Sequence, residues 1–181
     1  MILRNRKLNR KPQYDYSQNG YYFVTICTKN RIHWFGEIQN NKMNLNKFGE
    51  YTKQCWQNIP NHFPNINIDE YVIMPDHVHG ILIIDDAIGD DNHDDDDVGD
   101  NNYCPLRPTR HDEQTPWQTK WSRSISSSIR GFKIGVTKYF RQNDNNVFEW
   151  QRSFYDRIIR NEFEYQKIKK YIFNNPINWE K

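Results

Sequence analysis

A chain of 181 residues suits one compact domain and leaves little room for a second. Its three scattered cysteines lack a CxxC pair, and no apolar run approaches the length of a membrane span or resembles a signal peptide. We therefore expect a cytoplasmic protein without a disulfide framework or a cysteine zinc site. The formal net charge is only +2, but nine of the 23 acidic residues lie in 85–100, which leaves 14 acidic against 25 basic residues elsewhere. Such an excess is typical of nucleic-acid binders, although a solvated lysine-rich surface is an equal alternative.

The first part of the chain predicts strands followed by one helix. Residues 21–28 form a β-branched and aromatic run that is apolar on both faces, which indicates a central strand. Residues 33–38 and 42–45 predict a short hairpin across a polar turn. A helix is expected from about 47 to 59, because Pro60 follows.

Two further strands, 66–74 and 77–84, meet at the dipeptide Pro75-Asp76. The next residues, 85–119, contain the acidic run and three prolines without a usable period, and they predict a disordered or loosely packed insertion. Residues 121–142 then place apolar side chains at spacings of three and four. This pattern predicts an amphipathic helix with a basic outer face.

The C-terminal part predicts a short strand at 154–159 and a last helix that ends near Asn175. Asn161 and Glu164 have the spacing of a capping box, which indicates where this helix begins. The full order of elements predicts an α+β fold, a ferredoxin-like sandwich with a central antiparallel sheet, helices on one face and an added C-terminal helix. We expect 1–181 to form this single domain, interrupted by the insertion.

A pair of histidines is the first candidate for chemistry. Successive strand residues point to opposite faces, so His77 and His79 share one face and Val78 turns into the core. Two imidazoles and a third oxygen ligand would suit Mg²⁺ or Mn²⁺, although an exposed, unrelated pair of histidines is the alternative. Asp76 is expected to be an exposed turn residue, because alternation points it away from His77, with a role as ligand or ligand partner as the alternative.

Tyrosine is a suitable nucleophile for an enzyme that must keep one DNA end attached. Tyr171 stands out among eleven tyrosines because Lys167 lies one helical turn before it and Asn175 one turn after it. Lys167 could offset the charge of a phosphate, and Asn175 could offer an amide oxygen to a metal ion. The alternative is that Tyr171 is a half-buried packing residue.

Three segments carry a resemblance to a known family. The segment Met74–Leu82, MPDHVHGIL, resembles the His-hydrophobic-His (HUH) motif of the single-tyrosine transposases. Residues 148–162 and 171–176 resemble the branch of that family associated with repetitive extragenic palindromes (REP), and 21–28 also fits this branch. The likeness covers nearly the whole chain apart from the acidic insertion, and three segments in this order are far more specific than an H-x-H pair.

The resemblance implies a site as well as a fold. It implies that His77, His79 and Asn175 bind Mg²⁺ or Mn²⁺ and that Tyr171 is the nucleophile. Tyr165 and Tyr155 are substitutes for the nucleophile. Some relatives use an acidic metal ligand three positions before the first histidine, where this chain has a methionine.

The implied reaction is cleavage of single-stranded DNA that contains palindromic hairpins, by a bacterial enzyme that is a monomer or a homodimer. Attack by the tyrosine leaves a 5′-phosphotyrosyl link and a free 3′-hydroxyl, which can later attack the link and rejoin the strands. Candidate DNA contacts are basic side chains from several segments: Arg4, Arg6, Lys7, Arg123, Arg130, Lys133, Arg152, Arg157 and Lys167. Four tryptophans are candidates for stacking on bases, with core packing as the alternative: Trp117, Trp121, Trp150 and Trp179.

Two other functions stay open on the sequence alone. A replication initiator or relaxase shares the histidine pair, but this chain lacks a phosphate-binding Gly-rich loop and a tyrosine pair on its last helix. A ferredoxin-like nucleic-acid-binding module without catalysis would make the histidines incidental.

Overall fold

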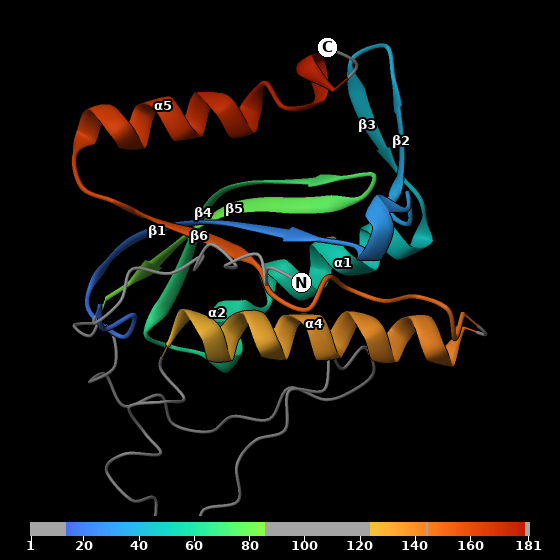
Figure 1. Ribbon diagram of the computed structural model, residues 1–181, viewed down its shortest axis with the longest axis horizontal. Helices are drawn as coiled ribbons and strands as arrows, with labels where there is room; N and C mark the ends of the chain where they lie inside the picture. Colours follow the sequence, from blue (N-terminus) through green and yellow to red (C-terminus); the bar gives the residue numbers. More distant parts are fainter. Residues whose placement is uncertain (1–13, 86–123, 144, 180–181) are drawn as a thin grey trace, which may run out of the picture.

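The computed structural model describes residues 14–85, 124–143 and 145–179 (Figure 1). Four antiparallel strands form the central sheet: β1 Gly20–Cys27, β4 Ile66–Met74, β5 His77–Ile84 and β6 Tyr155–Ile159. A separate hairpin and the helices complete the described fold: β2 Gly36–Gln39, β3 Lys42–Leu45, α1 Lys47–Gln57, α2 Ile59–His62, α4 Ile125–Gln142, α5 Glu162–Phe173, and the 3-10 turns η1 Lys29–Arg31 and η3 Pro176–Asn178. None of the helices in these ranges is both long and apolar enough to cross a membrane.

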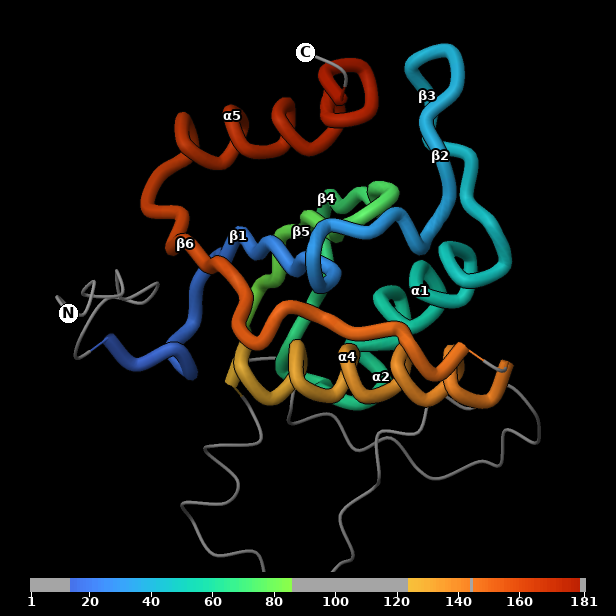
Figure 2. The backbone as a smooth tube through the Cα atoms, turned by 45° about the vertical axis from the view of Figure 1, so that its right-hand side comes forward, coloured from blue at the N-terminus to red at the C-terminus, as the bar shows by residue number. Residues whose placement is uncertain are grey.

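The sheet order is β4-β5-β1-β6, so the first and third strands of the sheet in chain order lie at its centre. This topology confirms the predicted ferredoxin-like sandwich. Helices α1, α2 and α4 cover one face, and α5 lies across the other (Figures 1 and 2). The C-terminal helix is therefore a third layer, on the opposite side of the sheet from α4.

Successive side chains of β1 point to opposite faces of the sheet, so this one strand contributes to the apolar clusters on both faces. Tyr22, Val24 and Ile26 are fully buried in the large core between the sheet and helices α1 and α4. Phe23 points the other way, into a smaller cluster that contains two other residues of the sheet and Ile168 and Ile172 of α5. A strand with apolar residues on both faces was expected to be central, and β1 has a neighbour on each side.

Several boundaries differ from the sequence prediction for local reasons. Pro60 does not simply end the helix that begins at Lys47; it lies in the first turn of α2, where its missing N–H has no helical acceptor. In the hairpin, Gln39 belongs to β2, and the turn consists of Asn40 and Asn41 with φ of 52° and 61°. Asparagine tolerates this left-handed region better than most residues, which explains the tight turn.

Helix α4 begins at Ile125, and the side chain of Ser124 accepts a hydrogen bond from the Ser127 N–H at 3.3 Å. The predicted first turn at 121–123 and the predicted insertion, apart from Asp85, lie outside the described residues. The capping box of α5 is present in a modified form. Asn161 Oδ1 accepts from the Glu164 N–H at 2.9 Å, while the Glu164 carboxylate accepts from the Arg160 N–H rather than that of Asn161.

Candidate active site

The histidine pair lies at the start of β5, immediately after the turn that joins it to β4. His77 and His79 both face the layer of α5 and the C-terminal turn, whereas Val78 is fully buried on the side of α1 and α4. The two imidazole centroids are 4.4 Å apart. The shared face predicted from strand periodicity is confirmed, and the rings are close enough for both to contact one ligand.

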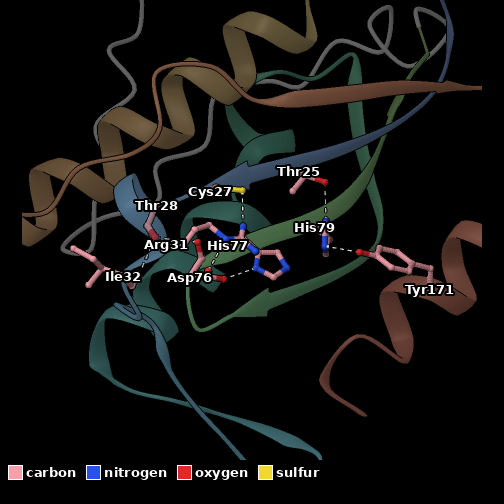
Figure 3. A network of polar contacts seen from close by, with 9 residues as sticks. All are labelled: Thr25, Cys27, Thr28, Arg31, Ile32, Asp76, His77, His79 and Tyr171. Carbon is pink, nitrogen blue, oxygen red and sulfur yellow. Dashed lines mark hydrogen bonds and ion pairs between the residues drawn. The ribbon is translucent and has the colours of Figure 1, made fainter. Parts of the chain in front are cut away.

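Each imidazole is oriented through its Nδ1 atom (Figure 3). His79 Nδ1 lies 2.8 Å from Thr25 Oγ1, on the residue directly opposite it in the β1–β5 pairing. His77 Nδ1 lies 2.6 Å from Asp76 Oδ1. Because Nδ1 of each ring has a partner in the protein, Nε2 is the atom of each ring best suited to a metal ion or a substrate.

Asp76 was expected to be an exposed turn residue, and this prediction was wrong. The residue is only 2% exposed, and its second carboxylate oxygen lies 2.8 Å from Arg31 Nε. Strand alternation failed as a guide because Asp76 is in the turn, where the backbone departs from strand geometry. A buried carboxylate is costly unless it is paired, and here both oxygens have a partner.

The surroundings of His79 keep its imidazole neutral. Burial, together with the nearby His77 and Arg31, lowers the pKa of His79 to about 3, although a hydrogen bond with the backbone of Val24 acts in the opposite direction. At neutral pH the ring therefore has an unprotonated nitrogen with a lone pair. A neutral imidazole is the form that binds a metal ion or accepts a proton.

Tyr171 brings the C-terminal helix to this pair. Its hydroxyl lies 3.2 Å from His79 Nε2 (Figure 3). Its ring packs edge-on against Phe23. Ile168 and Ile172 are buried on the sheet side of α5, while Tyr171 is 50% exposed at the flank of the helix. Tyr171 thus contacts the histidine through its hydroxyl while half of the residue is exposed to solvent.

The other residues proposed for the tyrosine helix have different surroundings. Asn175 is buried in the turn after α5, and its backbone N–H donates to the Ile172 carbonyl at 3.1 Å. Lys167 is exposed on α5. The Tyr165 hydroxyl donates to Asp69 on β4, so it is engaged away from the histidines. Tyr155 is 47% exposed on β6, directly opposite Thr25.

The side chains beside the histidine pair limit how a metal ion could be bound. Among the described residues, no three His, Cys, Asp or Glu side chains form a group that could hold a metal ion. The chain therefore offers two imidazoles, with the Asn175 amide as the third ligand predicted from sequence. A donor set of this kind keeps coordination positions for oxygen ligands from water or phosphate.

The predicted DNA contacts are dispersed. Arg4, Arg6, Lys7 and Arg123 lie outside the described residues; Arg130 and Arg152 are exposed, and Arg157 is exposed on β6 and pairs with Glu164. Lys133 donates from Nζ to the carbonyls of Gln151 and Ser153 at 2.8 and 3.2 Å, and burial lowers its pKa to about 8. Its DNA contact stays a prediction, but its ammonium already has two acceptors.

A hollow of about 510 Å³ lies along α4, on the far side of the sheet from the histidines. Its lining includes the basic residues Lys133, Lys138 and Arg141, together with Ile134, Thr137 and Gln142. The predicted basic face of α4 is therefore present, but it is not part of the histidine and tyrosine site.

Two residues beside the site were not singled out from the sequence. Thr25 contacts His79 and Arg31 contacts Asp76, and finding them requires the strand register and the path of the turn after β1. Trp179, a candidate for stacking on bases, stacks on His77 with centroids 5.7 Å apart, and Trp117 and Trp121 lie outside the described residues. Trp150 follows the core alternative, because its Nε1–H donates to the Lys133 carbonyl and its ring packs against the large core.

Known protein-family models give no match to the chain. A Haemophilus influenzae protein of uncharacterized function is 43% identical over 178 residues, which cover 98% of this chain and 92% of that protein. A second H. influenzae protein, provisionally named a REP-associated tyrosine transposase, is 24% identical over 163 residues, or 90% of this chain and 73% of its own length. Among solved structures, a REP-associated tyrosine transposase bound to a REP hairpin matches 94% of this chain and 74% of its own, with a TM-score of 0.55 and 18% identity.

Proposed function

We propose that the chain is a single-tyrosine transposase of the REP-associated branch, and that it cleaves and rejoins single-stranded, hairpin-containing DNA through Tyr171 with the help of a divalent metal ion. The observation that carries this proposal is the 3.2 Å contact between the Tyr171 hydroxyl and His79 Nε2. It joins a candidate nucleophile to the histidine pair although the two are 92 residues apart in the chain.

The residues fit the roles of nucleophile and metal ligand. Neutral His79 has one lone pair on Nε2, which would bind the ion, and the Tyr171 hydroxyl lies 3.2 Å from this nitrogen, where it would lose its proton to solvent and act as the nucleophile. Thr25 at Nδ1 fixes the orientation of the ring. In the proposed reaction the Tyr171 oxygen bonds to phosphorus, the bond from phosphorus to the 3′-oxygen breaks, and the 3′-oxygen takes up a proton.

The reverse step rejoins DNA. A 3′-hydroxyl attacks the phosphotyrosine, a new phosphodiester bond forms, and the tyrosine oxygen leaves. Because one phosphodiester bond is exchanged for another, no external energy source is required. This exchange suits a transposase better than a hydrolytic nuclease, because a nuclease transfers the phosphate to water and leaves no covalent link from which the strand can be rejoined.

His77, His79 and Asn175 are the residues proposed to hold the metal ion. A bound Mg²⁺ or Mn²⁺ would polarise the scissile phosphate and offset the charge that develops on it. Asp76 holds His77 through Nδ1 and leaves Nε2 for the ion. The tyrosine flank is half exposed, so a DNA strand can reach the hydroxyl from solvent.

The proposed substrate rests on the family and on charge. The structural relative was solved with a REP hairpin, and the chain has 25 basic residues, several of them exposed on α4, α5 and β6. We propose palindromic hairpins with single-stranded flanks as the DNA, bound by a monomer or a homodimer.

The test is formation of a protein–DNA adduct. A labelled hairpin oligonucleotide with single-stranded flanks, taken from palindromes beside the gene, is incubated with the protein and Mn²⁺ and run on a denaturing gel. We expect an adduct with wild type, none with Tyr171→Phe, and none after chelation of the metal. Tyr155→Phe is the matched control, because it removes a half-exposed hydroxyl from the same face of the sheet.

Two outcomes would contradict the proposal. If wild type forms no adduct with any hairpin from the flanking DNA, the chain is better described as a binding module without catalysis. If Tyr171→Phe forms as much adduct as wild type while Tyr155→Phe forms none, the nucleophile is Tyr155.

A further inference from the structure

Arg31 lies in an unusual turn directly after β1. Asn30 and Arg31 have φ of 56° and 57°, in the left-handed region that residues other than glycine rarely adopt. Such a conformation is strained and persists only where the surroundings enforce it. Thr28 provides part of that support, because its Oγ1 hydrogen-bonds to the carbonyls of Ile32 and Asp76 at 2.9 and 3.0 Å. The turn is therefore tied to the turn that precedes the histidine pair.

This backbone brings the Arg31 guanidinium beside the candidate active site (Figure 3). Nε lies 2.8 Å from Asp76 Oδ2, and Nη1 donates to Cys27 Sγ at 2.8 Å. Cys27 is directly opposite His77 in the β1–β5 pairing, so the guanidinium lies at the edge of the sheet face that holds the histidines. Asp76 is the residue that orients His77.

The Arg31 guanidinium is fixed by Asp76 and Cys27 and is still about half exposed to solvent. The Asp76 side chain is 3% exposed, whereas that of Arg31 is 49% exposed. Its two contacts use the Nε–H and one Nη1 hydrogen, out of five N–H groups. A planar guanidinium with one edge fixed by a carboxylate and the other open to solvent is preorganised for a phosphate oxygen.

The two exposed cations of this turn differ in their partners. Arg31 pairs with Asp76, the residue that contacts His77 Nδ1. Lys29, two residues earlier, is also exposed but pairs with Glu149. Arg31 is therefore the cation of this turn that lies beside the histidine pair.

We propose that Arg31 binds a phosphate of the DNA strand next to the scissile bond, an inference that rests on the function proposed above. Asp76 then has two roles: it orients His77 and it fixes the guanidinium. The strained turn is the means by which a residue at the end of β1 reaches this position.

The test measures binding apart from cleavage. In the full chain with Tyr171→Phe and a chelator present, the affinity for the fluorescein-labelled hairpin oligonucleotide is measured by anisotropy over a series of salt concentrations. Loss of one phosphate contact on a single strand should reduce the slope of log K against log salt by about 0.7. We expect this reduction, and binding weaker by about tenfold at moderate salt, for Arg31→Gln. Arg31→Lys retains the charge and should retain the slope.

Two controls separate a phosphate contact from a structural role. Lys29→Gln removes an exposed cation two residues away and should leave the slope unchanged. Arg31→Gln is also made together with Asp76→Asn, which removes the buried charge that Arg31 neutralises. If Arg31 served only Asp76, its loss would have no effect in this background. A phosphate contact predicts that the slope still falls, because the slope counts the lost cation whereas Asp76 only positions it. Thermal unfolding of each variant checks that it is folded.

The outcomes distinguish this inference from the proposed function. An unchanged slope for Arg31→Gln, or a reduction that disappears with Asp76→Asn, together with normal adduct formation by wild type, would overturn the role of Arg31 alone. Failure of wild type to form any adduct would overturn the proposed function and this inference with it.

Discussion

The two faces of the central sheet differ in what covers them (Figure 2). Against α1 and α4, the sheet packs a large apolar core in which residues such as Trp56 and Phe132 have no exposed surface. Against α5, the apolar cluster is smaller: it has five buried members, three partly buried residues pack against it, and His79 lies within reach of Tyr171 beside it. One face stabilises the fold, and the other holds the candidate chemistry.

Adjacent residues of one strand serve both faces. Val78 is part of the large core, while the histidines on either side of it face α5. Helix α5 also depends on polar contacts, since Lys169 pairs with Asp69 at 3.1 Å and Tyr165 donates to the same carboxylate. A helix held by few apolar contacts opens more readily than one in a large core. We therefore expect α5 to be the less stable layer.

The largest expected effect is the loss of unfolding free energy when a side chain of the large core is truncated, compared with truncation of a side chain on α5. Phe132→Ala should lower the free energy of unfolding by about 3–5 kcal/mol, because the ring is fully buried against Trp56 and Trp150. Phe163→Ala, on the outer side of α5 and 81% exposed, should change it by less than about 0.5 kcal/mol. Urea unfolding measures both values. Similar losses for the two variants would contradict the division between a packed face and a functional one.

The second prediction concerns pH and the α5 face. Burial lowers the folded-state pKa of His79 to about 3, so between about pH 6.5 and 3 the unfolded chain binds a proton that the folded chain does not. Stability should therefore fall as pH is lowered through this range, by on the order of a few kcal/mol in total, with chelator present. His79→Gln cannot titrate and should show a weaker dependence. If urea unfolding of wild type and His79→Gln gave the same pH dependence, the neutral buried imidazole would be refuted.

The third prediction tests the carboxylate behind the histidine pair. Asp76→Asn removes the charge that faces His77 Nδ1 and should weaken Mn²⁺ binding by about 10–100-fold. Titration calorimetry gives the affinity. Glu149→Gln removes an exposed carboxylate that pairs with Lys29 and is the matched control. Equal affinities for wild type and Asp76→Asn would show that His77 does not bind the ion through the proposed arrangement.

The smallest expected loss of stability comes from replacing the N-cap residue of α1 or of α5. Asn46 Oδ1 accepts from the N–H groups of Phe48 and Gly49 at the start of α1, and Asn161 Oδ1 accepts from that of Glu164 at the start of α5. Replacing either asparagine with alanine should cost about 1 kcal/mol. Adduct formation should fall only with Asn161→Ala, because α5 carries Tyr171. If both variants lowered the adduct equally, the effect would reflect global stability rather than the position of the tyrosine helix.

Sequence patterns alone predicted the order of the elements, the ferredoxin-like topology and the shared face of His77 and His79. These features follow from local periodicity, since a strand alternates every residue and a helix repeats every 3.6 residues. The position of Tyr171 on the last helix also followed from its local pattern and cap. Periodicity also predicted correctly that β5 begins at His77 and that the Val78 side chain points into the core.

Only the tertiary structure decided which side chains meet. The strand register sets Thr25 opposite His79, the turn after β1 directs Arg31 to Asp76, and the packing of α5 places the Tyr171 hydroxyl 3.2 Å from His79 Nε2. Asp76 was misplaced because its burial depends on Arg31, 45 positions earlier in the chain. Periodicity specifies the direction of a side chain within its own element, whereas its partners depend on how distant elements pack, and that packing is a property of the whole fold.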